Sequence, residues 1–430
     1  MAGIFAPLFC LAVAQAATVA DLPGTRREEA GWVYLKLAGS PRHIGKEYGR
    51  LAKVEIQDAH AALKLSLKEN TGKDWSWFRD TSKAIYWDKI DKEYQEELAG
   101  QAEGLTQAGF KADTWDVLAF NSYIETEGYY IPSLQNKPSN KEACSAFVST
   151  GSATKDGKVV MGHNLWWDYR MGQRFNFILD VTPAKGNRFV MDALAGFIHS
   201  GSDFAINSAG ILITETTISG FAGFDTKGIP EFMRMRKATQ YANSLDEFAA
   251  IMKKGNNGGY ANTWLLADTK TNEIGKLELG LKNVIFATAT DGSFVGSNFP
   301  ENPKLIAEEI PGGWDSGDLA NGCERRRARW KTLLRENDGQ VTDEKAKAFL
   351  ADTYDEVLKK NVASGGVLCG KGPLSGAINS KVVTADLAGK MSFWARMGVS
   401  DGSERKFGAN RPAMLRDIPS QPWVFFRPEK

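Results

Sequence analysis

The chain has 430 residues, of which 43% are hydrophobic and 24% are charged, the balance of a globular protein with a sizeable core. Its 53 Lys and Arg residues almost cancel its 52 Asp and Glu residues, so the basic excess typical of nucleic-acid-binding proteins is absent. These totals argue against a nucleic-acid partner. By default, the local cluster Arg325, Arg326, Arg327 and Arg329 is expected to form a solvated helix face.

The first residues are typical of an export signal. An apolar run from Ile4 to Ala14 leads into Ala14-Gln15-Ala16, which fits a signal-peptidase site. The run is shorter than the ~20 residues that a membrane-spanning helix needs. We therefore expect residues 1–16 to be a signal peptide, and the mature protein to be secreted or periplasmic (lysosomal in a eukaryote) without a stable membrane anchor. A disordered or buried tail is the alternative.

Hydrophobic periodicity divides the rest of the chain at Cys144. Before it, apolar residues recur at helical spacing, which predicts helices over 40–70, 92–109 and 114–130. From Cys144 the period changes toward two, and turn residues separate the runs. This pattern predicts strands at 145–150, 158–164, 175–182, 188–198 and 210–218.

The second half mixes helices and strands. A helix is expected over 243–255, with Ser244 and Glu247 as a capping box. Short strands follow over 262–292, helices over 323–337 and 342–361, and a hairpin over 381–398. Such an order predicts an α+β fold in which sheets pack between helical layers. We expect a helical N-terminal segment, residues 17–143, packed on a core of residues 144–430.

The four cysteines set a constraint on pairing. They are Cys10, Cys144, Cys323 and Cys369, and removal of a signal peptide would take Cys10 away. An odd number in an exported protein implies one unpaired thiol. Cys323 and Cys369 could pair, which leaves Cys144 as a thiol that needs an explanation.

A cysteine nucleophile needs a base. Among four histidines only His163 is close to Cys144 in sequence, and a strand–turn–strand hairpin would bring the two near each other. A second base would arise if the peptide between Ala143 and Cys144 were cut, because the new α-amine has a pKa of about 7.7–8. The alternatives are a buried structural histidine and a cysteine that acts as a small buried hydrophobe.

Other polar residues stand where strands begin or end. Asn262 precedes an apolar strand and could donate to an oxyanion, although asparagine also favours such turns. Thr217 ends a strand, and Asn298 lies in a turn. Neither a CxxC nor an HExxH motif occurs, so we expect no metal, and no cofactor motif is present.

Taken in order, several stretches resemble the phospholipase B-like family of cysteine N-terminal-nucleophile hydrolases. They are "GSPRHIGKEYGRL" (39–51), "CSAFVSTGSATKDGKVVMGHNLWWDYRM" (144–171), "GSDFAINSAGILITETT" (201–217), "GGYANTWLLADTKTNE" (258–273), "GSNFP" (296–300), "SKVVTADLAGKMSFWARMG" (380–398) and "PWVFFRPEK" (422–430). The chain is also similar to the acyltransferase-like C45 peptidases, through the stretch Ala261 to Asp268.

The resemblance implies a four-layer αββα sandwich and autocatalytic cleavage before Cys144, with both fragments remaining associated. It assigns Cys144 as nucleophile, Asn262 to the oxyanion site, and His163 and Trp166 to a GH-x-x-W motif. Thr217 falls where bile-salt-hydrolase relatives keep an oxyanion Asn. Those relatives have Arg and Asp in place of His163 and Trp166, which argues against a bile-salt or penicillin substrate. We place Asn164 and Asn298, with Trp166, at the substrate pocket.

The expected function is that of an exported, self-processed hydrolase that cleaves ester or amide bonds of acyl lipids. Two alternatives stay open. One is an amidase or acyltransferase of the C45 type that acts on small N-acyl compounds or peptides. The other is a non-catalytic exported binding protein.

Overall fold

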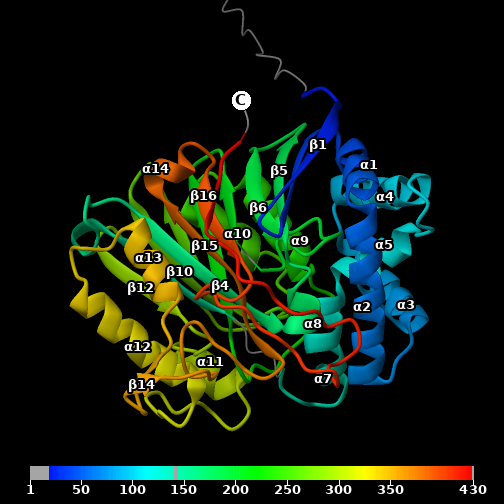
Figure 1. The fold of residues 1–430 in the computed structure, drawn as a ribbon. Helices are drawn as coiled ribbons and strands as arrows, with labels where there is room; N and C mark the ends of the chain where they lie inside the picture. Colours follow the sequence, from blue (N-terminus) through cyan, green and yellow to red (C-terminus); the bar gives the residue numbers. More distant parts are fainter. Residues whose placement is uncertain (1–18, 140–143, 203, 429–430) are drawn as a thin grey trace, which may run out of the picture.

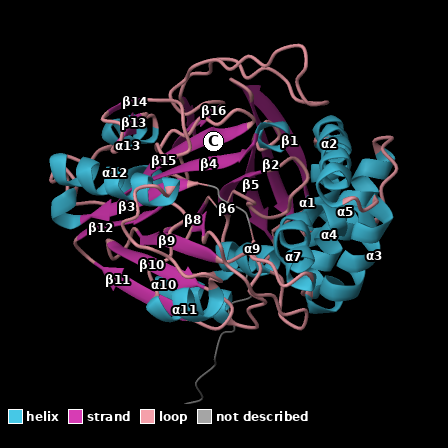
Figure 2. Ribbon diagram, turned by 90° about the horizontal axis from the view of Figure 1, so that it is seen from below, coloured by secondary structure: helices cyan, strands magenta, loops and turns pink. Residues whose placement is uncertain are grey.

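The computed structural model describes residues 19–139, 144–202 and 204–428. The predicted signal peptide (1–16) and Ala143, at the predicted cleavage site, lie outside these residues. Two sheets face each other between helical layers, as Figures 1 and 2 show. The expected α+β sandwich of four layers is thereby confirmed.

The larger sheet has nine strands and includes β1, the first strand of the described residues. In spatial order the strands are β1 (Leu22–Glu29), β2 (Trp32–Gly39), β5 (Phe177–Pro183), β6 (Phe189–Ala193), β7 (Ala205–Asn207), β8 (Ile211–Thr217), β9 (Asn262–Asp268), β10 (Glu273–Leu279) and β11 (Val284–Ala289). Neighbouring strands in this sheet are antiparallel, except that β2 and β5 are parallel.

The smaller sheet has six antiparallel strands and packs on the larger one through β3, β4 and β12. Its order is β12 (Gly292–Gly296), β3 (Ser145–Thr150), β4 (Val160–Asp168), β15 (Ser375–Thr384), β16 (Phe393–Met397) and β17 (Val424–Phe426). A separate short pair joins β13 (Tyr354–Asp355) to β14 (Lys360–Asn361).

Helices cover the outer faces of both sheets (Figure 2). On the larger sheet pack α1 (Pro41–Leu51), α9 (Glu231–Tyr241) and α10 (Leu245–Lys253). The helices that pack beside α1 and on one another are α2 (Lys53–Thr71), α3 (Trp75–Tyr86), α4 (Lys92–Gln107) and α5 (Thr114–Asn121). Over the smaller sheet lie α12 (Gly322–Glu336) and α13 (Asp343–Leu350). Short helices are α6 (Tyr123–Glu125), α7 (Ile131–Leu134), α8 (Tyr169–Gly172), α11 (Pro303–Glu309) and α14 (Ala385–Ala388). Within the described ranges, no helix is both long and apolar enough to cross a bilayer.

Glycines set the contact between α1 and α4. A Cβ on Gly45 would lie 1.9 Å from the carbonyl oxygen of Glu97, and one on Gly104 would lie 2.0 Å from that of Lys46. Gly49 and Gly100 meet the opposite backbone in the same way. The two helices therefore pack backbone to backbone, which fixes α4 against the helix that covers β2 and β5.

Two sequence expectations need correction. The N-terminal segment is not only helical, because β1 and β2 form a hairpin before α1 and extend the larger sheet. The helix expected over 342–361 ends at Leu350. Beyond it, the Asp352 side chain accepts the backbone N–H of Tyr354, and the Asp355 side chain accepts those of Val357 and Leu358, so both favour turns.

The pairing of strands decides which residues face the space between the sheets. Ala146, His163 and Lys381 lie side by side across β3, β4 and β15. Lys381 donates to Asp192 on β6, so this row faces the larger sheet. The next row, Ser145, Asn164 and Ser380, alternates to the other face, toward α12 and α13.

Candidate active site

Cys144 lies directly before β3 and is fully buried. Its φ of 92° falls in the left-handed region, which non-glycine residues seldom adopt. Such a conformation costs of order 1–3 kcal/mol and persists only where the surroundings hold it, often at functional sites. The backbone at the predicted nucleophile is therefore strained in the folded chain.

His163 and Cys144 do come together, as the hairpin predicts. Because Ala146 on β3 pairs with His163 on β4, Cys144 lies two residues from the partner of His163. The Cys144 thiol, the His163 ring and the Glu215 carboxylate offer donor atoms that all lie within 4.8 Å of one another. All three side chains are buried.

Glu215 lies near the end of β8, where, among the described residues, this strand is paired on one side only. Strand β7 pairs with β8 only at Ile213 and Leu212, whereas β9 pairs with β8 as far as Thr217. The last residues of β8 thus have a strand partner on one side. Glu215 lies in this segment, and its Oε1 accepts from the Cys144 Sγ at 3.8 Å. A buried carboxylate in contact with a thiol can take the thiol proton.

Hydrogen bonds hold the Glu215 carboxylate in place. The Tyr260 hydroxyl donates to Oε1 at 3.3 Å, and the Thr217 hydroxyl donates to Tyr260 at 2.8 Å. With its amide assigned in the orientation that places the nitrogen opposite this carboxylate, Asn262 donates to Oε2 at 2.9 Å. The predicted residues Thr217 and Asn262 therefore belong to the cluster, and both reach the thiol through Glu215.

The amide of Asn262 is fully used in this arrangement. Its nitrogen donates to Glu215 and to the carbonyl oxygen of Ala261, each at 2.9 Å. An amide nitrogen has two N–H groups, so an oxyanion would have to replace one of these acceptors. The oxyanion role of Asn262 stays a prediction.

Arg326 closes the opposite side of the nucleophile. Its Nη1 donates to the carbonyl oxygen of Cys144 at 2.7 Å and to the Ser145 hydroxyl at 3.2 Å. Its Nη2 donates to Asn298 at 3.0 Å, and its guanidinium lies 4.5 Å from the centre of the Trp166 ring. The expectation that this arginine cluster is solvated is wrong for Arg326, which is 1% exposed because the buried carbonyl, hydroxyl and amide oxygens need its donors.

The remaining predicted pocket residues divide between two places. Asn298, at a φ of 68°, donates to the carbonyl oxygen of Thr217 at 2.9 Å and so joins the end of β8 to Arg326. Asn164 lies apart, in the row that faces α12 and α13. Its amide donates to the carbonyl oxygens of Leu350 and Leu368 at 2.8 and 3.1 Å, a role in packing the helical layer.

The electrostatics of His163 are set by burial. Burial lowers the pKa of His163 well below its usual value, and the Lys381 ammonium lowers it further, while a backbone group of Glu215 acts in the opposite direction. Lys381 itself is fully buried and donates to Asp192 at 2.8 Å and to Asn379 at 2.6 Å. The imidazole is therefore neutral, and because burial disfavours its protonated form it is a weak base.

The cysteines of the described part of the chain remain as thiols. No disulfide joins Cys323 to Cys369 there. The Sγ of Cys323 lies 3.4 Å from Arg326 Nη2 and 3.7 Å from the Ser219 hydroxyl. Burial raises the pKa of Cys369 to about 12, so that thiol stays protonated.

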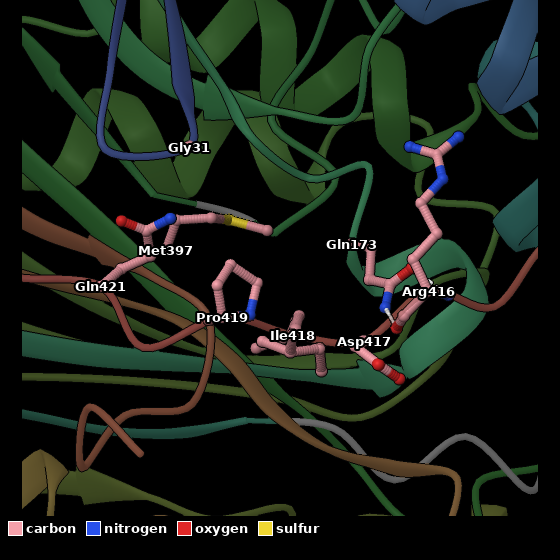
Figure 3. Close-up of a pocket in the computed structure, with 10 residues that line it drawn as sticks. Gly31, Gln173, Met397, Arg416, Asp417, Ile418, Pro419 and Gln421 are labelled. Atoms are coloured by element: carbon pink, nitrogen blue, oxygen red, sulfur yellow. Dashed lines mark hydrogen bonds between the residues drawn. The ribbon is translucent and has the colours of Figure 1, made fainter. Parts of the chain in front are cut away.

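A pocket of about 160 Å³ opens elsewhere, beside the β1–β2 turn. Figure 3 shows Met397, Ile418 and Pro419 along its wall, with the Gln173 amide bound to the backbone of Arg416. None of its lining residues belongs to the cluster around Cys144, so it does not form part of the candidate active site.

Sequence reasoning missed three residues of the cluster. Glu215 stood in an apolar strand, where a carboxylate needs a partner, and this was the available signal. Arg326 was hidden within a run of arginines on a helix. Tyr260 had no signal, since the fold alone brings the loop before β9 against the end of β8.

Comparison with known proteins gives a family match. The model of the phospholipase B family matches residues 86–333, more than half of the chain. Phospholipase B of Crotalus adamanteus is 23% identical over 322 residues, covering 67% of this chain and 55% of that protein. An uncharacterized protein of Archaeoglobus fulgidus is 27% identical over 302 residues, covering 63% of this chain and 48% of that protein.

Human phospholipase B-like 1 is 29% identical over 136 residues, 30% of this chain and 24% of that protein. The chain thus spans about half the length of these relatives, or less. Among solved structures, penicillin V acylase from Agrobacterium tumefaciens aligns with a TM-score of 0.35 and 11% identity over 59% of this chain and 83% of that chain. The C2A mutant of conjugated bile acid hydrolase from Clostridium perfringens gives 0.34 and 10% over 66% and 97%.

Proposed function

The chain belongs to the phospholipase B family, and from this membership and the geometry at Cys144 we propose that it is an exported acyl hydrolase that activates itself by cleavage before Cys144. The substrates are acyl lipids, attacked at an ester or amide bond. The Crotalus adamanteus relative is a phospholipase B, which supports a lipid ester as the substrate. We expect this reaction to need no metal or cofactor.

One observation carries the proposal. A buried thiol, on a residue with a φ of 92°, has a carboxylate at 3.8 Å and an imidazole within 4.8 Å. A cysteine with a purely structural role needs neither polar neighbour, since a buried cysteine behaves as a small hydrophobe. Strain at the same residue favours reaction of the peptide that precedes it, because cleavage releases the strain.

Maturation would proceed in two balanced steps. Glu215 accepts the thiol proton, and the Cys144 Sγ attacks the carbonyl carbon of Ala143. The C–N bond then breaks, the nitrogen takes a proton to become the α-amine of Cys144, and Ala143 is held as a thioester. Water hydrolyses the thioester, which leaves a carboxylate on Ala143 and restores the Cys144 thiol.

The mature enzyme would use the same sulfur on a substrate. The α-amine of Cys144 takes the thiol proton and later returns it to the leaving group. Asn262 would hold the oxyanion by exchanging the Ala261 carbonyl for the substrate oxygen, and one such donor lowers the barrier by roughly 3 kcal/mol in comparable sites. Arg326 orients Cys144 through its carbonyl oxygen, and His163 orients the thiol.

The fragments would remain associated after the cut. The N-terminal fragment supplies β1 and β2 of the larger sheet, and β2 pairs with β5 of the second fragment over Val33 to Gly39. The α1 helix also packs on β5. Separation would expose both partners of this buried pairing to water.

Intact mass and N-terminal sequencing of the purified protein test the proposal, with wild type beside Cys144→Ala and Cys369→Ala. We expect two fragments from wild type and from Cys369→Ala, the second beginning Cys-Ser-Ala-Phe, and one uncut chain from Cys144→Ala. A single uncut wild-type chain would mean that Cys144 has no α-amine to act as base, and it would contradict the proposed maturation. Release of fatty acid from phospholipids, against release from N-acyl amines, then separates a lipid hydrolase from an amidase.

A further inference from the structure

We propose that Cys144, His163 and Glu215 form a binding site for a zinc ion, which would block the nucleophile and so inhibit both cleavage and hydrolysis. The sequence shows no zinc motif, because the three residues come from the position directly before β3, from β4 and from β8. The fold alone collects a sulfur, a nitrogen and an oxygen ligand. The metal site itself does not require the hydrolase function, whereas the inhibition rests on the function proposed above.

The distances suit a tetrahedral ion after a small adjustment. Zinc binds sulfur at ~2.3 Å, and imidazole nitrogen and carboxylate oxygen at about 2.0–2.2 Å, so neighbouring ligand atoms are roughly 3.3–3.7 Å apart. Here the Cys144 Sγ and the Glu215 Oε1 are already 3.8 Å apart. All ligand atoms lie within 4.8 Å of one another, so no separation has to shorten by more than about 1 Å.

The surrounding groups support metal binding. Tyr260 and Asn262 donate to the Glu215 carboxylate, and such outer hydrogen bonds fix the orientation of a metal ligand. Neither nitrogen of the buried His163 ring has a partner of standard hydrogen-bond geometry in the described ranges. An ion would supply that partner.

The charges also balance. A thiolate and a carboxylate together neutralise Zn²⁺, and the nearby Lys381 is already paired with Asp192 at 2.8 Å. Binding would release the proton of the Cys144 thiol, because the thiolate is the form that binds metal. If the chain is cut before Cys144, the new α-amine offers a fourth ligand beside its own sulfur. This last step rests on the proposed cleavage, and it predicts tighter binding by the cut chain.

Zinc content and a cobalt spectrum test the site on the full chain stripped of metal with a chelator. After equilibrium dialysis against zinc sulfate, we expect one zinc per wild-type chain. Cys144→Ser, His163→Gln and Glu215→Gln should each bind at least 100-fold more weakly. Cys369→Ser and His60→Gln, which alter another buried cysteine and another buried histidine, should bind as wild type does.

A second test uses wild type alone, so its result does not depend on whether a variant folds. Cobalt in place of zinc should give a strong near-ultraviolet absorption band from the thiolate, and zinc should remove it. Absence of that band, or equal zinc binding by Cys144→Ser and wild type, would overturn the site. A chain that binds zinc but is never cleaved would contradict the proposed function and leave the metal site standing.

Discussion

Two buried histidines, His60 in the helical layer and His163 between the sheets, look alike until their neighbours are compared. Both are at most 5% exposed, and burial is the main cause that lowers the pKa of each. His60 packs among aromatic rings, with Trp75 at 4.6 Å and Phe120 at 5.7 Å between ring centres. His163 faces a thiol and a carboxylate. Burial and a lowered pKa therefore do not identify a site, whereas reactive neighbours do.

Replacing each histidine by glutamine tests this difference most directly. His163→Gln should lower the rate of acyl release by about a hundredfold, because the thiol loses the ring that orients it for attack. His60→Gln should leave the rate within about twofold, because no reactive group contacts it. Initial rates on a fluorogenic acyl ester would measure both. Equal losses in the two variants would mean that His163 acts only through packing.

The charged groups beside each histidine should differ in their contribution to stability. Lys381→Met leaves Asp192 buried and unpaired, and should lower the free energy of unfolding by about 3–5 kcal/mol. Arg79→Met breaks ion pairs to Asp113 and Asp116 near His60, where the Arg79 side chain is 31% exposed. That change should lower the free energy of unfolding by about 1 kcal/mol or less. Urea denaturation of both variants gives the comparison, and a larger loss for Arg79→Met would reverse it.

The buried carboxyl of Glu125 should make the stability of the protein depend on pH. Burial raises the pKa of Glu125 to about 7, against which hydrogen bonds from Asn257 and the Phe232 backbone act. The unfolded chain titrates near 4.5, so the folded state loses stability as pH rises from about 4.5 to 7. The stability of Glu125→Gln relative to wild type should thus increase by roughly 3 kcal/mol between pH 4 and pH 8.

Urea titrations of wild type and Glu125→Gln at several pH values measure this difference. Glu28→Gln, at an exposed position, is the matched control and should show a flat difference. A flat difference for Glu125→Gln would show that the carboxyl is ionised in the folded protein.

The smallest effect concerns His60 itself, where the sign is opposite. Burial lowers the pKa of His60 to about 3, so wild type is fully stable above the unfolded value near 6.5 and loses stability as pH falls. His60→Phe removes that loss. Relative to wild type it should gain about 2 kcal/mol between pH 7.5 and pH 5, as thermal or urea unfolding would show. A constant difference would mean that folded His60 accepts a proton freely.

The sequence predicted the strand framework well where local pattern dominates. The run 145–150 forms β3 without change, and the helix beginning after Ser244 is capped by that serine as expected. Prediction failed at 351–361, where helical spacing competed with turns formed by the Asp355 side chain. The hairpin of β1 and β2 was not predicted either, because its position in the sheet depends on pairing with β5, which is distant in sequence.

The candidate site was predictable only as far as local sequence reached. Cys144 and His163 share a hairpin, so their approach follows from one turn. Glu215 and Arg326 meet the nucleophile from 71 and 182 residues away, through packing of two sheets and one helix. No spacing rule encodes such contacts. Asn164, adjacent to His163, was misplaced because alternation along a strand sends neighbours to opposite faces.

The parallel pairing of β2 with β5 has a consequence for synthesis of the chain. Strand β2 ends at Gly39, but β5, its partner, begins only at Phe177. At ~5–20 residues per second, a ribosome needs roughly 7–30 s to make the segment between them. During that time β2 has only β1 beside it, and its outer edge is open to other chains. The first third of the protein therefore cannot complete its fold until the nucleophile has already been made, which delays any self-cleavage until both sheets exist.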